Sequence, residues 1–436
     1  MDIAIIIGLA AILGLYMAWN IGANDVANSM ADAVGSRALS IKQAVILAGI
    51  CEFAGAVLVG AHVTDTVRKG IVDPSVLANL PGMSPVDAAA LLIIGMTVSL
   101  LSAAIWLNYS SWAGMPVSTT HSIVGAVAGF GIISAGYQAV NWGKMGQIVA
   151  SWFISPIAGA AMAFLLFKFI SRAILGQHRP VRAAKKYVPY IVFMVIAVVT
   201  LATIYKGLKH VIGGVEWMCG WTSFIIAGVL STAGALLSRK FINNYLEGKD
   251  DLKISDQLDE VERVFSPLVV VSSCSVAFAH GANDVANAVG PLAAIVNIAQ
   301  TGNVAMKVGV PFWVLALGGT GIVLGLATYG YRVMATVGTK ITEITPSRGV
   351  AADIAATTVV LVCTRMKLPI STTHTLVGAI LGIGLARGLG GIDSTITKKI
   401  FGSWFITVPA AAILSMIMFF IGKELFFETI RNFIAH

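Results

Sequence analysis

Long apolar runs, separated by short polar segments, follow one another along almost the whole chain. Most of them are close to the roughly 20 residues that a helix needs to cross the hydrocarbon core of a bilayer. Pro116 and Pro369 stand where either a full span or a re-entrant half-helix can begin. The pattern predicts an all-α membrane protein with about twelve transmembrane helices, near residues 3–30, 43–62, 86–109, 117–137, 147–171, 188–206, 215–238, 265–299, 308–331, 351–365, 369–387 and 400–422.

Two polar motifs interrupt the apolar runs, and each motif occurs once in either half of the chain. The motif GANDVAN stands at 22–28 and again at 281–287, and PVSTTH at 116–121 is followed by PISTTH at 369–374. Because order and spacing are kept, we predict two homologous five-span units around a central helix pair. The expected parts are an N-terminal transport repeat at 1–171, a central part at 172–264 with a basic loop, two linker helices and a charged loop, and a C-terminal repeat at 265–436.

Positive charge in the connecting segments predicts the orientation of these units. The segments 172–186 and 239–263 carry many Lys and Arg residues, and two spans separate them, so both can face the cytoplasm. We expect the second segment to be a surface linker or a short amphipathic helix. The two repeats are then inverted, and both termini lie outside the plasma (inner) membrane. Inverted repeats with interrupted helices are typical of secondary transporters, which bind substrate near the middle of the membrane.

Composition narrows the class of protein further. The chain has 436 residues, of which 57% are hydrophobic and only 11% are charged, whereas a soluble globular protein carries about 25% charged residues. The net charge of +8 fits basic cytoplasmic loops, and no aromatic-basic face indicates a nucleic-acid partner. The four cysteines form no close pair in the sequence, and we expect small core residues at Cys51, Cys219, Cys274 and Cys363.

The first motif places a carboxylate inside an apolar run in each half of the chain. An Asp at the centre of a membrane helix costs about 2.5–3.5 kcal/mol, and such a residue is a functional-site hypothesis by default. The glycine before it lets the helix open and offer free backbone carbonyls. Carboxylates, carboxamides and backbone carbonyls offer hard oxygen ligands, which suit a small cation such as Na⁺. The alternative is a proton bound to the Asp carboxyl. The expected ligands are Asn24, Asp25, Asn28, Asn283, Asp284 and Asn287.

The second motif predicts an anion site. Proline suits the first turn of a helix, and a helix start carries free N–H groups and roughly half a positive charge, which attract anions. Two such starts can hold one tetrahedral oxyanion from two sides with neutral donors, which release it easily. The expected donors are Ser118, Thr119, Thr120, Ser371, Thr372 and Thr373, and we expect His121 and His374 to support them.

Two further acidic residues lie inside apolar runs. Glu52 has no counterpart in the second half, so that a functional role and a structural partnership both stay open. Asp353 stands near the start of a predicted span, so a position at the membrane interface explains it as well as a role at the site.

The duplicated motifs resemble those of the inorganic phosphate transporter (PiT) family, and the resemblance covers both halves of the chain. Further matching stretches are AHGAND at 279–284, NAVGPL at 287–292 and ITPS at 344–347. The resemblance implies symport of phosphate with Na⁺ or H⁺ through an inverted-repeat fold. It also implies that Glu52 and His280 are functionally important polar positions, and that Asp353 stands where relatives have Glu.

The sequence therefore predicts a secondary active symporter that imports inorganic phosphate with Na⁺. A proton-coupled phosphate or sulfate permease of the same fold is the alternative. A channel would need charge rings along a pore and an enzyme would need a nucleophile-base set or a metal cluster, and we see neither pattern in the sequence. The expected partners are phosphate, the transported coupling ion Na⁺ and membrane lipid, with no nucleic acid; a homo-oligomer stays open.

Overall fold

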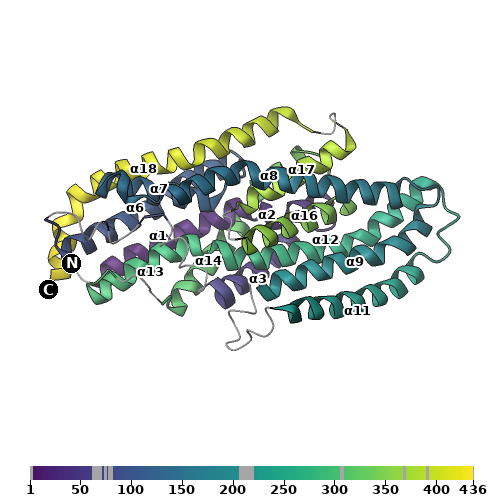
Figure 1. The fold of residues 1–436 in the computed structure, drawn as a ribbon, viewed down its shortest axis with the longest axis horizontal. Helices are drawn as coiled ribbons and strands as arrows, with labels where there is room; N and C mark the ends of the chain where they lie inside the picture. Colours follow the sequence, from purple (N-terminus) through teal and green to yellow (C-terminus); the bar gives the residue numbers. More distant parts are fainter. Residues whose placement is uncertain are drawn as a thin grey trace.

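The computed structural model describes residues 3–60, 71–72, 76, 82–205, 220–304, 309–366, 370–388 and 392–435. Figure 1 shows an elongated bundle of helices, and the described residues contain no β-strand beyond a single bridge between Val72 and Val140. The helices of more than one turn are α1 (Ile3–Asp25), α2 (Ala27–Gly35), α3 (Ile41–Val59), α6 (Pro85–Trp112), α7 (Thr119–Ala135), α8 (Trp142–Ile170), α9 (Pro180–Thr203), α11 (Trp221–Tyr245), α12 (Ile254–Asp284), α13 (Ala286–Thr301), α14 (Phe312–Thr328), α15 (Tyr331–Ala335), α16 (Pro346–Arg365), α17 (Thr372–Arg387) and α18 (Ser394–Ala435).

The described residues do not confirm the predicted count of twelve membrane-spanning helices. Within the described residues, nine helical segments are long and apolar enough to cross a membrane, or ten when α14 and the bent segment Tyr331–Lys340 count as one span. The expected spans 117–137 and 369–387 became α7 and α17, of 17 and 16 residues, which is shorter than the roughly 20 residues of a full span. Hydropathy alone hides this difference, because a half-helix buried in protein is as apolar as a span.

Both short helices begin at the serine of the second motif. Ser118 and Ser371 are the N-cap residues, and each hydroxyl oxygen accepts a hydrogen bond from the backbone N–H of the motif histidine at 3.2 Å. Pro116 therefore lies two residues before the cap, outside the first turn where we expected it. Pro369 lies outside the described residues. Each short helix forms a hairpin with the helix before it in the chain (Figure 1).

The first motif interrupts its helix, but by less than predicted. The expected single spans 3–30 and 265–299 are each divided, at Val26 and Val285. Both valines keep helical backbone angles, with φ/ψ of −56°/−26° and −54°/−31°. The break is one residue long, so each aspartate ends one helix and the next helix begins two residues later.

The basic segments are largely helical. Helix α9 begins at Pro180, within the predicted loop 172–186. Only residues 246–253 separate α11 from α12, within the segment 239–263 that we expected to be a surface linker or a short amphipathic helix. The α8–α9 and α11–α12 connections lie at one end of the bundle, and both termini lie at the other end (Figure 1).

Glycines let the helices of the two halves pack backbone to backbone. A Cβ on Gly22 of α1 would overlap the carbonyl of Ile322 on α14, and one on Gly281 of α12 would overlap the carbonyl of Glu52 on α3. These two crossings are equivalent, since Gly22 and Gly281 begin the two copies of the first motif. Close contacts between Ala-rich and Gly-rich helices hold membrane bundles together where the hydrophobic effect cannot.

Two of the four cysteines lie at one helix crossing, although they form no close pair in the sequence. Cys51 on α3 and Cys274 on α12 each stand four residues before the close contact between Gly55 and Phe278. Cys363 is buried on α16, and Cys219 lies outside the described residues.

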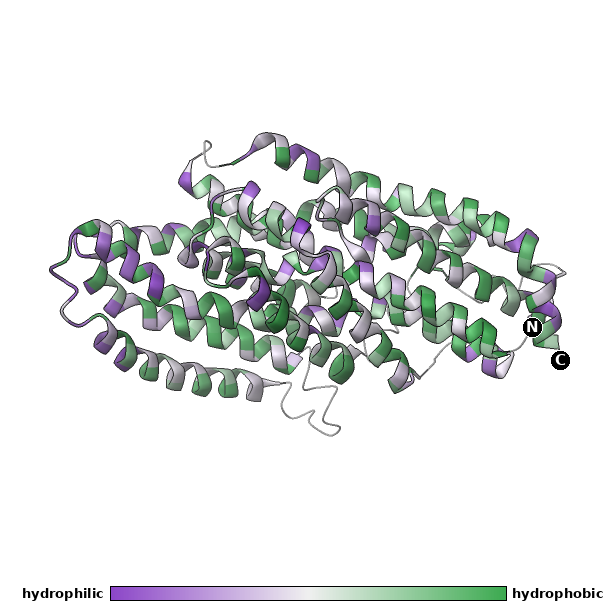
Figure 2. Cartoon of the chain, turned by 180° about the vertical axis from the view of Figure 1, so that it is seen from behind, coloured by the Kyte–Doolittle hydropathy of each residue, from purple (hydrophilic) through white to green (hydrophobic). Residues whose placement is uncertain are grey.

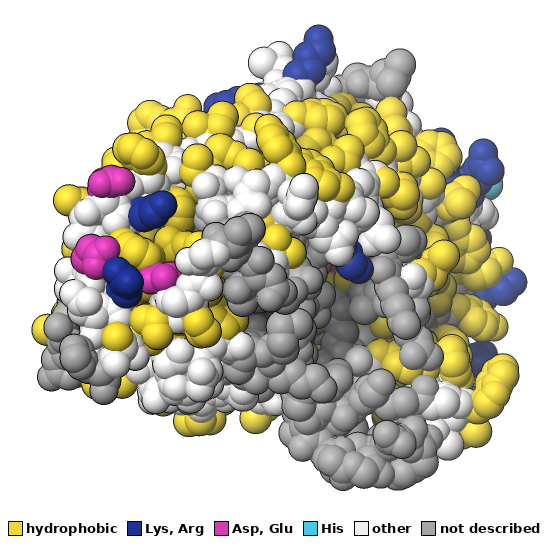
Figure 3. Space-filling model, turned by 60° about the vertical axis from the view of Figure 1, so that its left-hand side comes forward, with side chains coloured by type: hydrophobic (Ala, Val, Ile, Leu, Met, Phe, Trp, Pro, Cys, Tyr) yellow, Lys and Arg dark blue, Asp and Glu magenta, His cyan; other side chains and the backbone are white. Residues whose placement is uncertain are grey.

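Large apolar side chains cover much of the outer surface. Leu237 is 73% exposed, Ile157 65% and Phe420 64%, and such a surface suits lipid because a monomer in water rarely exposes it. Hydrophobic residues run along the helices in Figure 2, with hydrophilic residues gathered mainly towards the two ends. Most of the described surface in Figure 3 is also hydrophobic, with charged side chains in a few places.

Candidate functional site

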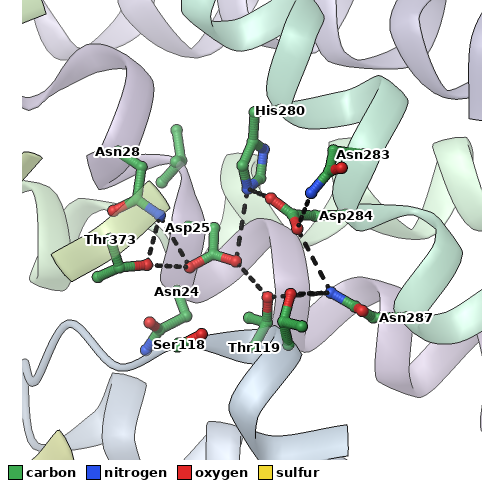
Figure 4. Close-up of polar contacts among 12 residues, drawn as sticks. Asn24, Asp25, Asn28, Ser118, Thr119, His280, Asn283, Asp284, Asn287 and Thr373 are labelled. Atoms are coloured by element: carbon green, nitrogen blue, oxygen red, sulfur yellow. Dashed lines mark hydrogen bonds and ion pairs between the residues drawn. The ribbon is translucent and has the colours of Figure 1, made fainter. Parts of the chain in front are cut away.

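The four motif copies converge at one buried place in the middle of the bundle. Helices α1 and α12 end there with Asp25 and Asp284, and α7 and α17 begin there with the second motif (Figure 4). Asp25 is 1% exposed and Asp284 is 2% exposed. Two carboxylates, four amide side chains and several hydroxyls thus share a volume that the rest of the protein encloses.

The Asp25 carboxylate accepts hydrogen bonds from both halves of the chain. Its Oδ2 accepts from Thr119 Oγ1 at 2.7 Å, and its Oδ1 accepts from Asn28 Nδ2 at 3.1 Å and from Thr373 Oγ1 at 3.4 Å. The two predicted sites are therefore not separate: hydroxyls expected to hold an anion contact a carboxylate expected to hold a cation.

His280 bridges the two aspartates. Its Nε2 lies 2.9 Å from Asp284 Oδ2 and 3.4 Å from Asp25 Oδ2. Asp284 Oδ1 in turn accepts from Asn283 Nδ2 at 3.1 Å and from Asn287 Nδ2 at 3.4 Å. One oxygen from each aspartate and one nitrogen from His280 lie within 4.8 Å of one another, close enough to share a cation.

Glu52, which the sequence left without a role, faces the other side of His280. Its side chain is completely buried, its Oε2 lies 3.4 Å from His280 Nδ1, and its Oε1 accepts from Ser29 Oγ at 3.2 Å. The histidine is thus surrounded by three carboxylates. In the other half, Gly22 contacts the Ile322 carbonyl in the way that Gly281 contacts the Glu52 carbonyl. Ile322 of α14 therefore stands at the position equivalent to Glu52, and the Glu52 carboxylate has no counterpart on that side of the site.

The motif asparagines connect the two halves reciprocally. Asn28 Nδ2 donates to Thr373 Oγ1 at 2.8 Å, and the equivalent Asn287 Nδ2 donates to Thr120 Oγ1 at 3.1 Å and approaches Thr119 Oγ1 at 3.3 Å. Each first motif therefore contacts the helix start that belongs to the opposite half. Sequence order alone does not reveal this pairing.

Asn24 has a different environment from the one expected for a cation ligand. Its Nδ2 donates to Ser111 Oγ at 3.0 Å and to the Met115 carbonyl at 3.1 Å, and its Oδ1 accepts from Val117 N–H at 3.1 Å. These three contacts fix the loop between α6 and α7, so that Asn24 positions the start of α7.

The remaining hydroxyls of the second motif have mixed environments. The oxygens of Ser118 and Ser371 cap their helices, as described above, and each retains its own hydrogen as a donor. Thr372 lines a cavity of ≈ 40 Å³ together with Asn28 and His280. This cavity has room for a small ion or water.

The two motif histidines pack against each other. The rings of His121 and His374 meet edge to face with 5.0 Å between centroids, and His374 stacks on Trp404 at 3.8 Å. Trp404 Nε1 donates to the Pro116 carbonyl at 2.9 Å. The pair therefore lies where the two helix starts meet.

Asp353 belongs to a second acidic cluster. It is buried rather than interfacial, at 1% exposure, and it accepts hydrogen bonds from Ser272 and Ser273 of α12. Ser273 Oγ also contacts Asp32 Oδ1 at 3.3 Å, and Asp32 is equally buried. The sequence analysis did not single out Asp32, although its spacing of seven residues from Asp25 places it two helical turns further along.

Comparison with known proteins identifies relatives over nearly the whole chain. Residues 21–415 match the family described as "Phosphate transporter family". A protein of Pyrococcus abyssi named "Putative phosphate permease" is 46% identical over 94% of this chain and 96% of the relative. The chloroplastic "Inorganic phosphate transporter 2-1" of Arabidopsis thaliana is 42% identical over 93% of this chain and 70% of the relative. A solved structure titled "The sodium-dependent phosphate transporter" has a TM-score of 0.82 and 39% identity, and the match covers 96% of this chain and 99% of that structure.

Proposed function

The chain belongs to the phosphate transporter family, and from that premise we propose that it is a secondary active symporter importing inorganic phosphate with Na⁺. It is a multi-pass membrane protein, and its family is one of transporters rather than enzymes. The observation that carries the Na⁺ part of the proposal is the convergence of two buried aspartates on one histidine.

The cations would bind at the two aspartates. A buried carboxylate without a compensating charge is very unfavourable, and one imidazole proton compensates only one of the two. Carboxylate and amide oxygens are the hard ligands that Na⁺ prefers, in the same way as other hard cations. We assign this role to Asp25, Asn28, Asn283, Asp284 and Asn287, and we assign Asn24 to positioning because its amide holds the α6–α7 loop.

The phosphate would bind between the starts of α7 and α17. Each start offers free N–H groups at the positive end of a helix, and the hydroxyls of Thr119 and Thr373 already lie against Asp25. When cations neutralise the aspartates, these hydroxyls become free to turn towards an oxyanion. The six donors of this proposed site are Ser118, Thr119, Thr120, Ser371, Thr372 and Thr373.

This arrangement gives a physical reason for coupling. Phosphate is repelled by the negative charge of the two aspartates, and Na⁺ at those carboxylates removes the repulsion. Each cargo ion therefore improves the binding of the other, and equilibrium linkage makes the effect reciprocal. Glu52, His280 and Asp353 would tune the charge of the site, and His121 and His374 would hold the two helix starts together.

We further propose the inverted arrangement of repeats 1–171 and 265–436 around the central part 172–264. The equivalent helix crossings and the placement of both termini opposite the basic connections support it (Figure 1). On this assignment the basic connections face the cytoplasm, and the protein lies in the plasma (inner) membrane with both termini outside.

Proton coupling is the second candidate, and a specific contact favours it. His280 lies between Asp25, Asp284 and Glu52 at 2.9–3.4 Å, so that a proton on its ring is shared with three carboxylates. A proton could then occupy the place of one Na⁺.

Uptake of labelled phosphate into liposomes that contain the purified protein separates the candidates. A Na⁺ gradient should drive uptake at constant pH, and an imposed proton gradient without Na⁺ should not. Sulfate in excess serves as the competitor that tests the anion. Uptake driven equally by protons alone would assign coupling to His280, and inhibition by sulfate at phosphate-like concentrations would reassign the substrate.

A further inference from the structure

A pair of cysteines joins the two halves of the chain close to the polar centre. Cys51 lies on α3 of the first half and Cys274 on α12 of the second half, where these two helices pack closely against each other. Both cysteines are only partly buried. We propose that Cys51 and Cys274 form a redox-active dithiol site, which closes to a disulfide between the two halves and thereby stops transport.

The geometry of the helix crossing supports this pairing. A Cβ on Gly55 would overlap the carbonyl of Phe278, so the backbones of α3 and α12 approach each other very closely there. Cys51 and Cys274 each lie four residues before this contact, on the same helix faces, since side chains at i and i+4 share a face. Disulfides need Cα atoms about 4.4–6.8 Å apart, and few membrane helices approach closely enough without such glycines.

Packing alone does not require cysteine at these positions. The equivalent crossing of α1 and α14 has Gly325 against the Trp19 carbonyl, matching Gly55 against Phe278. One turn earlier on these helices stand Gly321 and Leu15, and a Cβ on Gly321 would lie 3.3 Å from the Leu15 side chain. An apolar pair therefore fills the equivalent space, and the two thiols bring a chemistry that the crossing itself does not need.

The neighbours of the thiols indicate what the disulfide would restrict. Cys51 precedes Glu52, which lies 3.4 Å from His280 across the same crossing. Cys274 follows Ser273, which bonds to Asp32 and Asp353. A covalent bond here fixes α3 against α12 between the two acidic clusters, so any rearrangement that separates Glu52 from His280 is blocked.

The reaction is a two-electron oxidation. The two thiols lose two protons and two electrons as the S–S bond forms, and a lipid-soluble two-electron acceptor such as a quinone or an azo compound takes up both. Because both side chains are only partly buried, such a molecule can reach the pair. A dithiol reductant reverses the step.

The test uses the full chain in liposomes, treated with the azo oxidant diamide. Mass spectrometry of unreduced peptides should identify a Cys51–Cys274 disulfide, and phosphate uptake should be lost in parallel and restored by dithiothreitol. The variants Cys51→Ser and Cys274→Ser should keep their uptake in diamide. Cys363→Ser is the matched control, and it should remain as sensitive as the natural chain.

Each other result counts against the proposal. If the cross-linked peptide is absent after saturating oxidant, the proposed dithiol site is overturned. This peptide measurement requires neither a variant nor transport activity. A disulfide that leaves uptake unchanged would overturn the block on transport. Sensitivity that persists in both serine variants would assign the effect to another cysteine. Failure of phosphate uptake before oxidation would count against the proposed function alone, because the peptide readout is independent of it.

Discussion

The Asn28 amide donates a hydrogen bond of 2.8 Å to the hydroxyl of Thr373, which stands in the opposite half of the chain. Asn287 makes the equivalent contact with Thr120 at 3.1 Å. Each hydroxyl oxygen accepts from an amide, and the Thr373 hydroxyl in turn donates to Asp25 Oδ1 at 3.4 Å. The two contacts therefore hold one hydroxyl from each helix start beside the motif of the opposite half.

The first prediction concerns these hydroxyls. Thr120→Val and Thr373→Val should each weaken phosphate binding by about 1–2 kcal/mol, or roughly five- to thirty-fold, as for a lost hydrogen bond to a charged group. Isothermal titration in detergent with saturating Na⁺ measures the effect. The control is Thr375→Val, one turn into α17, whose hydroxyl bonds to its own helix at the Ser371 carbonyl. Equal losses in all three variants would indicate general damage to α17 and contradict the anion site.

The second prediction concerns stoichiometry. Two acidic motifs imply two cation sites, so Na⁺-dependent phosphate binding should have a Hill coefficient well above one. Asp25→Asn and Asp284→Asn should each abolish or severely slow coupled uptake and lower the coefficient of residual binding towards one. If a single Na⁺ binds per phosphate in the natural chain, the two-site assignment is wrong and proton coupling through His280 gains support. Two Na⁺ with monovalent phosphate would move one positive charge inward, which is worth about 2.3 kcal/mol per 100 mV.

The third prediction concerns the glycine crossings. Gly281→Ala adds a Cβ that overlaps the Glu52 carbonyl, and overpacking of this kind costs about 1–3 kcal/mol. The thermal midpoint in detergent should fall, and the shift of α12 against α3 should also lower uptake. Gly228→Ala on α11 is the control, because a Cβ there meets nothing within 4 Å. A stable, active Gly281→Ala protein would show that the two helices can separate without loss of the site.

The fourth prediction concerns orientation. In a background without native cysteines, single cysteines at Gln177 and Glu247 should react with impermeant maleimide only from the cytoplasm, and one at Asn432 only from outside. All three positions are exposed, and Glu247 avoids the left-handed backbone of Gly248. Labelling of Gln177 and Asn432 from the same side would reject the inverted arrangement.

The sequence by itself determined the class of the protein and the chemistry of its centre. Apolar runs with few charges require a membrane, and this inference depends only on composition. The duplicated motifs identified Asp25, Asp284 and both helix starts, since a polar motif copied inside an apolar run stands out wherever it lies.

Only the tertiary structure decided how these parts meet. Several contacts depend on helix crossings between distant segments. They are the contact of each asparagine with a helix start, the contact of Glu52 with His280, the bridge through Ser273 from Asp353 to the unforeseen Asp32, and the placement of Cys51 and Cys274 at one crossing. Those crossings are set by glycines that permit backbone contact, and the sequence does not show which helix packs against a given glycine. For a related reason, the sequence left open whether the segments 117–137 and 369–387 form full spans or re-entrant half-helices. Burial in protein and burial in lipid select the same apolar residues, so hydropathy cannot distinguish the short helices α7 and α17 from full spans.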